Sequence, residues 1–447
     1  MSAVREELEE TSVFLLKQLL DGGADDAVVH AVSSSVQQVK FANNKIVKTE
    51  ADDGLTATVF IAKNGRTAMT TLKHFSKSNA VETAARLARF ASSLQPNPSY
   101  AGIAEGPFDY APKNFFDSKI ALLEDKAVDL VEEAVNAALE QGAERTAGVL
   151  EWASEEEFLT TSRSVEARDE GTTSYFSLRA LAGSGSGHRV AVSRTLSKLG
   201  AAAAAREAAW LAATSRNPVQ AKAGNYDVVF DSLAFSCLLD AVGQATSVFS
   251  VEAGFSFFAG RQGKKVASPS FTLYDDGTIA NGFNSRRFDD EGVPTRRNLL
   301  VDKGVLKQFL HNTSTAKRHG TRTTANAGLV APQPWNLVVK PGTHSFDELL
   351  SEARNGLYVT NVWYTRFQNY VSGDFSTIPR DAAFLVKDGE LCQPVKELRV
   401  SENMVSLLQR VKALGNKSVQ VKGWEVETPV FTPPALVEKV RVTRPTS

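Results

Sequence analysis

The sequence predicts an α+β fold: an N-terminal α/β domain with a duplicated helix–β-meander–helix unit, followed by a β-rich, barrel-like C-terminal domain. Three observations support this prediction. The chain of 447 residues is long enough for two or three domains with hydrophobic cores. One order of helical and strand-like segments occurs twice within about 220 residues. Short strand-like segments then dominate. We expect domains at 1–222 and 223–447, separated by the polar segment 215–225.

The first unit begins with an amphipathic helix over residues 5–20, which Gly22 and Gly23 end. Asn64-Gly65 forms a hairpin turn before a strand at 66–72, and a helix over 78–94 closes the unit. Alternating or β-branched residues predict the strands between the first helix and this turn, at 27–32, 36–42, 45–51 and 55–63.

The second unit repeats this order between a helix over 122–143 and an alanine-rich helix over 201–213. Aligning Asp52-Asp53-Gly54 with Asp169-Glu170-Gly171 places the Asn64-Gly65 turn beside the segment GSGSG (183–187). We therefore interpret GSGSG as a hairpin turn and not as a phosphate-binding loop. The strands of this unit are predicted at 147–153, 156–162, 164–171, 174–183 and 188–193.

The second half begins with a strand at 226–230 and a helix over 231–245. Asp-Gly and Lys-Gly turn signals then separate short strands, which is typical of a β-rich α+β domain. The turn signals lie at 275–277, 302–304 and 387–389, and short helices are predicted at 313–319, 345–354 and 402–413.

Composition excludes several classes of function. Fifty basic against 51 acidic residues give a formal net charge of −1, which attracts neither nucleic acid nor an anionic membrane. Two cysteines, Cys237 and Cys392, fit a reducing compartment. The acidic N-terminal segment lacks the apolar core of a signal peptide, and no run of about 18 apolar residues occurs. We expect a cytoplasmic protein with no nucleic acid and no membrane among its partners.

Common catalytic motifs are absent from the sequence: it has no phosphate loop, no G-x-S-x-G and no H-E-x-x-H. The nearest histidine pair, His311 and His319, is eight residues apart and is interpreted as surface or cap residues. We expect no metal site in this chain.

Two polar segments are candidates for substrate binding. The charged segment 286–298 is either a solvated loop with surface ion pairs or the wall of a groove that fixes a peptide or carboxylate. The segment 370–376 is either a structural turn or a cavity lining that lets another backbone approach closely. The candidate residues are Asp290, Glu291, Arg296, Arg297, Gly373, Asp374, Phe375 and Ser376.

Four segments in this order resemble the TldD/PmbA (TldE) family: FFAGRQGKKVAS (257–268), DDEGVPTRRNLLVDKGVLKQFLHNTSTAKRHG (289–320), NYVSGDFS (369–376) and FLVKDGELCQPVKELRVSENM (384–404). The resemblance is strong from about residue 225 to 415 and extends by pattern over the rest. It implies a duplicated-looking α/β N-terminal domain and a β-rich C-terminal domain, in agreement with the prediction above.

The resemblance also explains a polar pair inside an apolar helix, Asp240 and Gln244. TldD-type chains carry zinc on an H-E-x-x-x-H motif plus a cysteine near the C-terminus, whereas TldE-type chains lack these ligands. Here Leu239 and Gln244 stand at the two histidine positions and Asp240 at the glutamate position. No cysteine follows Cys392. The resemblance therefore implies a degenerate site with no confident catalytic residue and no cofactor in this chain.

This resemblance implies a TldE/PmbA-like, non-metal-binding subunit of a cytoplasmic TldD/TldE-type zinc metallopeptidase that degrades or processes unfolded peptides. Zinc is then expected in a TldD-type partner of a heterodimer. The alternative is a stand-alone homodimer that binds peptide or another ligand without hydrolysis. A third hypothesis, a modulator of DNA gyrase, gains no support from the near-neutral charge.

Overall fold

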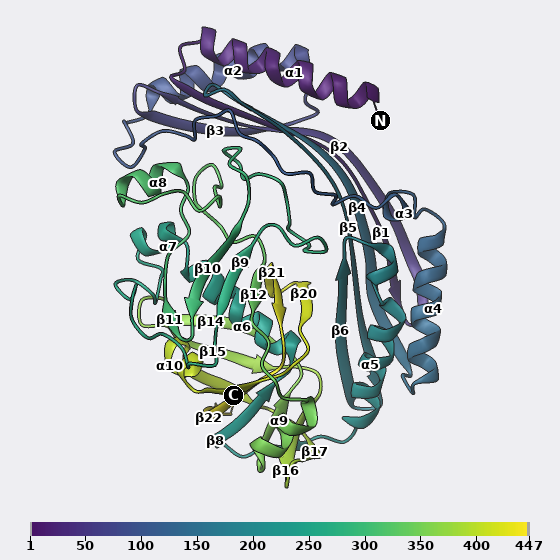
Figure 1. The fold of residues 1–447 in the computed structure, drawn as a ribbon. Helices are drawn as coiled ribbons and strands as arrows, with labels where there is room; N and C mark the ends of the chain where they lie inside the picture. The colour runs from purple at the N-terminus through teal and green to yellow at the C-terminus, as the bar shows by residue number, and fades with distance from the viewer. Residues whose placement is uncertain (1, 445–447) are drawn as a thin grey trace.

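The computed structural model describes residues 2–444 and contains three β-sheets. A long curved sheet carries helices on its outer face and holds the C-terminal half of the chain on its inner, concave side (Figure 1). The helices are α1 (Ser2–Asp21), α2 (Lys77–Ser93), α3 (Ser118–Ala121), α4 (Lys126–Glu140), α5 (Ala201–Thr214), α6 (Ser232–Ala245), α7 (Val248–Glu252), α8 (Thr313–Arg318), α9 (Phe346–Ala353) and α10 (Met404–Gln409).

The strands are short in the C-terminal half and long in the N-terminal sheet. They are β1 (Asp26–Ala42), β2 (Lys45–Lys63), β3 (Arg66–Lys73), β4 (Arg145–Thr161), β5 (Val165–Ala182), β6 (Gly185–Ser193), β7 (Val219–Gln220), β8 (Gly224–Phe230), β9 (Leu273–Asp276), β10 (Arg297–Asp302), β11 (Val305–Leu306), β12 (Leu337–Val339), β13 (Gly356–Val359), β14 (Val362–Asn369), β15 (Asp374–Pro379), β16 (Ala383–Lys387), β17 (Glu390–Lys396), β18 (Arg399–Asn403), β19 (Val411–Leu414), β20 (Val419–Gly423), β21 (Val426–Thr432) and β22 (Ala435–Thr443).

The N-terminal sheet has the strand order β3-β2-β1-β4-β5-β6, with every neighbouring pair antiparallel. The order α1-β1-β2-β3-α2 returns as α4-β4-β5-β6-α5. The two units meet where β1 pairs with β4 from Val28 to Ala42. The duplicated helix–β-meander–helix unit predicted from the sequence is therefore present, and its two copies form one continuous sheet.

The predicted pairs of short strands are single long strands, so the predicted breaks within them are wrong. One end of β1 contributes Ala27, Val29 and Ala31 to a core with α1 and α2, and the other end contributes Val39 and Phe41 to a core with α4. Between these ends the strand is only partly buried. Its polar middle is the stretch that lies between the two helix pairs, and polarity there does not interrupt the strand.

Two-residue turns connect the hairpins at Asn64-Gly65 and at Gly183-Ser184, where Gly183 has a φ of +56°. The GSGSG segment is thus a hairpin turn, as predicted. Its later glycines belong to β6 and have a different role. A Cβ at Gly187 would lie closer than 3.0 Å to the carbonyl oxygen of Ala208 in α5. The missing side chain allows α5 to pack directly on the edge strand.

The C-terminal half contains two open sheets, so it is β-rich but does not close into the expected barrel-like form. One has the order β11-β10-β9-β12-β21-β20, and the other runs from β14 to β7. Helix α6 lies between them, because its apolar residues share one core cluster with strands of both sheets. The predicted helix over 402–413 ends earlier, at Gln409, since Val411 pairs with Val437 as part of β19.

Within residues 2–444, no helix combines the length and apolar character needed to cross a membrane.

Candidate functional site

Helix α6 carries the three zinc-motif positions Leu239, Asp240 and Gln244, and most of its residues are buried. Asp231 caps its N-terminus by accepting a hydrogen bond from the backbone N–H of Leu233 at 3.1 Å. Eleven of its 14 residues are buried, including Leu239, which is fully enclosed in the core. Of its two polar motif positions, Asp240 is partly buried and Gln244 is exposed.

Asp240 and Gln244 both find their partner in Thr428 of β21. Asp240 Oδ1 accepts a hydrogen bond from the Thr428 backbone N–H at 2.8 Å. Gln244 Nε2 donates to Thr428 Oγ1 at 3.3 Å. The i, i+4 pair therefore presents one polar face to the neighbouring strand. Between them, a Cβ at Gly243 would lie 2.5 Å from Leu337, so close helix–strand packing accounts for this glycine.

Burial raises the pKa of Asp240 to about 6, while the hydrogen bond from Thr428 lowers it and the nearby Glu427 raises it further. A carboxyl group with this pKa changes charge near neutral pH. It has the protonation behaviour of a weak base, but its Oδ1 is already committed to Thr428.

The donor set at this position does not fit zinc. Leucine has no donor atom, and a single carboxylate plus an amide do not supply the nitrogen or sulfur ligands that zinc prefers. Cys237 lies one turn earlier, donates to the Leu233 carbonyl oxygen at 3.3 Å and has a pKa well above the ordinary thiol value because it is buried. In the part of the chain that the structure describes, no three His, Cys, Asp or Glu side chains converge as ligands.

A cavity of about 340 Å³ lies beside the first half of α6, between that helix, the N-terminal sheet and the β20–β21 turn. Several of its polar lining residues hydrogen-bond to one another. Its lining residues are Tyr175, Ser177, Arg179, His188, Val190, Leu233, Cys237, Asn361, Val362, Trp363, Arg380, Gly423, Trp424, Glu425 and Val426.

His188 is the titratable group of this cavity that most resembles a catalytic base. Its Nε2 lies 3.0 Å from Ser177 Oγ, and its Nδ1 lies 3.3 Å from Asn361 Nδ2. An amide nitrogen only donates, so Nδ1 accepts and Nε2 carries the proton toward the serine. Burial lowers the pKa of His188 to about 4. This tautomer cannot take a proton from Ser177, so the pair does not form an activated nucleophile.

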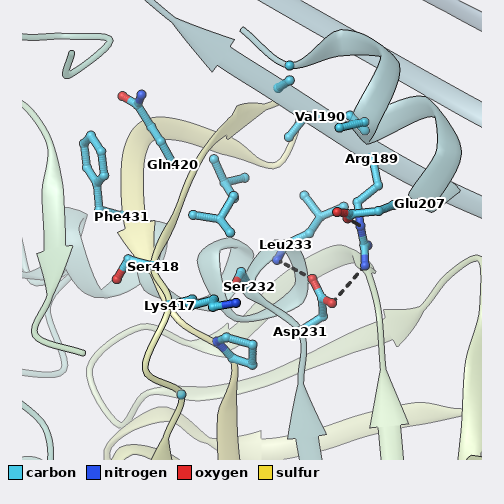
Figure 2. Close-up of a pocket in the computed structure, with 18 of the residues that line it drawn as sticks. Arg189, Val190, Glu207, Asp231, Ser232, Leu233, Lys417, Ser418, Gln420 and Phe431 are labelled. Atoms are coloured by element: carbon cyan, nitrogen blue, oxygen red, sulfur yellow. Dashed lines mark hydrogen bonds and ion pairs between the residues drawn. The ribbon is translucent and has the colours of Figure 1, made fainter. Parts of the chain in front are cut away.

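A larger cavity of about 820 Å³ lies between the N-terminal unit and the C-terminal sheets (Figure 2). Arg189 of β6 reaches Asp231 at 3.0 Å and Glu207 of α5 at 3.1 Å. Asp231 also accepts a hydrogen bond from the Tyr358 hydroxyl at 2.5 Å. This polar cluster joins the two halves of the chain on one wall, while Val190, Leu233 and Phe431 supply apolar surface.

Two edge strands border this larger cavity. β6 is the last strand of the N-terminal sheet, and β20 is the last strand of the C-terminal sheet that begins with β11. Both strands contribute lining residues. The Gln420 side chain bridges the two strands, donating to the backbone oxygen of Val192 at 3.5 Å. An edge strand carries unpaired backbone groups on its free side, so this cavity offers backbone hydrogen bonding as well as side-chain contacts.

The charged segment 286–298 is neither a solvated loop nor a wall of either cavity. Arg286 pairs with Glu157 of β4 and with Asp290, each at 3.0 Å, and Arg287 pairs with Asp169 of β5 at 3.3 Å. The segment is the contact between the concave face of the N-terminal sheet and the C-terminal half. The ion pairs of Arg286 and Arg287 are largely shielded from water, so breaking one of them is costly.

The four candidate residues of this segment have different environments. Asp290 belongs to the Arg286 pair, and Glu291 is buried, with its pKa raised to about 8 by burial. Arg296 is exposed and donates to the Thr323 carbonyl oxygen. Arg297 is exposed and stacks over the Tyr274 ring at 3.7 Å from its centroid.

The turn at 373–376 is well packed. Gly373 has a φ of +84°, and a Cβ there would lie 3.0 Å from Phe257. Phe375 is buried in the core, and Ser376 Oγ accepts from Gln368 and Arg399. Asp374 is exposed, and hydrogen bonds from Ser372 and Asn403 hold its pKa below the ordinary value.

None of the eight candidate residues lines the 340 Å³ or the 820 Å³ cavity among the residues that the structure describes. Sequence reasoning missed the cavity residues because they come from segments far apart in the chain. Only Asp231 carried a local signal, as an aspartate directly before an apolar helix.

Comparison with known proteins places the fold and then the family. TldE from Thermococcus kodakarensis superposes with a TM-score of 0.87 over 97% of this chain and 100% of that one, at 21% identity, so the two share a fold. The family model of the PmbA/TldA metallopeptidase central domain matches residues 119–216, and that of the C-terminal domain matches residues 223–444. The chain belongs to the PmbA/TldD family.

Curated relatives align over part of their length. A metalloprotease of Methanothermobacter thermautotrophicus is 34% identical over 200 residues, which is 43% of each chain. The metalloprotease PmbA of Escherichia coli O157:H7 is 29% identical over 162 residues, 36% of this chain and 34% of that one. In both alignments the chain spans less than half the length of the relative.

Proposed function

We propose that this chain is a TldE-type subunit that holds no zinc itself and works with a zinc-bearing TldD-type chain in a cytoplasmic peptidase acting on unfolded peptides. The observation that carries the proposal is the state of helix α6. At the three positions where the resemblance places zinc chemistry, Leu239 is core and Asp240 and Gln244 both bind Thr428. These side chains serve helix packing, which supports the proposal that the metal comes with a partner.

Peptide handling is supported by the larger cavity. An extended peptide pairs with the free edge of a sheet through its backbone, without requiring a particular sequence. The edges of β6 and β20 flank about 820 Å³ of space with mixed polar and apolar walls. We propose that unfolded substrate passes along these edges.

A partner surface is supported by aromatic side chains outside the cavities. Phe255 is 58% exposed and Tyr370 is 50% exposed. The centroids of their two rings are 5.8 Å apart. Val371 at the same hairpin tip is 59% exposed. A joined apolar patch of this kind marks an association surface, and we propose that the TldD-type subunit covers it. The patch adjoins the turn at Gly373, through which the candidate segment 373–376 would face the partner.

The test is reconstitution with a TldD-type chain. Purified alone and dialysed, this chain is expected to hold no stoichiometric zinc and to hydrolyse no casein-like substrate, and activity is expected only from the mixture. Tyr370→Ala is expected to weaken the assembly, with Tyr364→Ala as the exposed aromatic control. One tightly held zinc per isolated chain, or activity that follows this chain alone through purification, would overturn the proposal.

The second candidate is a homodimeric peptide- or ligand-binding protein without hydrolytic activity. It is favoured by the mixed polar and apolar walls of both cavities, which suit the binding of a ligand without hydrolysis. Native mass separates the candidates: a stable homodimer that ignores a TldD-type chain supports the second one.

A further inference from the structure

The 340 Å³ cavity beside α6 has aromatic walls. Trp363 of β14 and Tyr175 of β5 line it, and Trp424 lines it from the turn between β20 and β21. Trp424 is 87% exposed, so its indole stands at the rim and is left largely uncovered by the protein. Flat aromatic surface next to a cavity is suited to cover a flat apolar group of a ligand.

The cavity also contains an arginine whose charge has no direct counter-ion. The Arg380 guanidinium lies 3.7 Å from the centroid of the Trp363 ring. Its sequence neighbour Asp381 gives its two oxygens to Arg179, at 2.9 and 3.2 Å, and one of them also to Asn361. Within residues 2–444, no carboxylate lies within ion-pair distance of Arg380 and its side chain donates no hydrogen bond to the protein.

Neighbouring groups compensate this charge only in part, through the more distant Asp381. Burial first, and the nearby Arg179 second, lower the pKa of Arg380 below the ordinary arginine value. His188 on the adjacent wall is neutral, because burial lowers its pKa to about 4. An arginine held over a ring, with its fork of N–H groups free, presents the geometry that binds a carboxylate with two parallel hydrogen bonds.

We propose that this cavity is a binding site for a carboxylate that bears a flat apolar group, with Arg380, held over Trp363, binding the carboxylate and Trp424 covering the apolar part. The volume of about 340 Å³ suits a group of about one aromatic residue. Two sources share this chemistry: the C-terminal residue of a peptide and a free aromatic carboxylate. The site belongs to this chain alone, so it stands or falls separately from pairing with a TldD-type subunit.

One wall group opposes the ligand and therefore offers a test of opposite sign. Glu425 lines the cavity from the same turn as Trp424, and its charge acts on Cys237 across the cavity wall, where it helps to raise the thiol pKa. A negative side chain here repels a carboxylate ligand. Replacing it by glutamine is expected to tighten binding, whereas loss of the Arg380 charge weakens it.

The experiment is calorimetric titration of the full chain with matched acid and amide probes. N-acetyl-L-phenylalanine represents the free carboxylate, a tetrapeptide ending in phenylalanine represents a chain end, and the amide of each lacks the charge. Both acids, or one of them, are expected to bind at least about tenfold more tightly than the matching amide. The acid that binds more tightly identifies the source.

Variants then locate the site. Arg380→Gln is expected to lose about tenfold or more in acid affinity, and Arg380→Lys an intermediate amount, because lysine keeps the charge without the fork. Glu425→Gln is expected to gain severalfold. The matched control is Arg366→Gln: Arg366 also stacks on an aromatic ring, that of Tyr364, but lines no part of the cavity.

Three results would overturn the assignment. One is equal affinity for acid and amide in the unmodified chain, which needs no variant to fold. Another is no acid binding up to about 1 mM, the weak end of specific recognition. The third is a folded Arg380→Gln chain that binds the acid as the control does.

Discussion

Replacing the partly buried carboxyl group of Asp240 should stabilise the protein at neutral and alkaline pH. Asp240 lies on the buried helix α6, and its pKa of about 6 stands above the ordinary value of 3.8, chiefly because of burial. Since the folded chain holds the proton more tightly than the unfolded chain, ionisation of this group opposes folding. The variant Asp240→Asn keeps an oxygen for the Thr428 backbone N–H and removes the charge.

The magnitude follows from the difference between the two pKa values. A pKa that moves from 3.8 to about 6 corresponds to about 3 kcal/mol of folding free energy. Below about pH 4 the group is protonated in both states, so the carboxyl group costs little there. The cost grows as the pH rises from about 4 to about 6 and is complete above that range. We expect Asp240→Asn to change the free energy of unfolding little at pH 4 and to raise it by up to about 3 kcal/mol at pH 8.

The assay is urea unfolding of the two chains at pH 4, 6 and 8, compared as differences so that other buried acids cancel. Asp52→Asn is the control, because Asp52 is exposed on β2 and a change there should stay within about 0.5 kcal/mol at each pH. A variant that is destabilised at pH 8, or whose effect is the same at all three pH values, would refute the assignment of a buried, costly charge. Asp240 would then be stabilised by contacts beyond Thr428.

Two further predictions concern how the halves and the repeats pack. Gly187→Ala should destabilise the protein by about 2 kcal/mol or more, because the new Cβ overlaps the backbone of α5. The control Gly54→Ala should change stability little, because its Cβ meets its nearest atom at 3.7 Å. Equal effects of the two variants in urea unfolding would contradict the packing role of Gly187. Arg286→Ala should cost about 3 kcal/mol or more of folding free energy, since the Glu157 carboxylate loses the guanidinium that helps to hold its pKa at about 2. Limited proteolysis should then cut the chain between its two halves. An unchanged cleavage pattern would show that the Arg286–Glu157 pair does not join them.

Local sequence signals predicted most elements of the fold. The hairpin turns at Asn64-Gly65 and Lys303-Gly304 lie between strands as expected, because a two-residue glycine turn needs only its own backbone. The helix at α6 was also predicted closely, since its cap and its apolar residues are adjacent in the chain. Strand length was not predicted: Ser33 to Ser35 look like a break, but the strand passes between two helix pairs there and continues.

The candidate site divides in the same way. The absence of zinc-ligand side chains at Leu239 and Gln244 is a property of residue identity, so the sequence alone determined it. That Asp240 and Gln244 point at a strand depends on β21, which lies nearly 190 residues later and supplies Thr428 to both. Their common partner was therefore beyond any local pattern.

By itself, the sequence determined the duplicated helix–β-meander–helix order, the hairpin turns and the near-zero charge. It also determined that Leu239 and Gln244 on α6 are not zinc-ligand residue types. Each of these depends on neighbouring residues or on composition. Only the tertiary structure decided that Arg286 and Arg287 form ion pairs with β4 and β5, and that Arg380 lies free over Trp363. The physical reason is that burial and charge compensation are set by groups brought together from distant segments. The same arginine-rich sequence is a solvated loop in water and the joint between two halves when a concave sheet covers it.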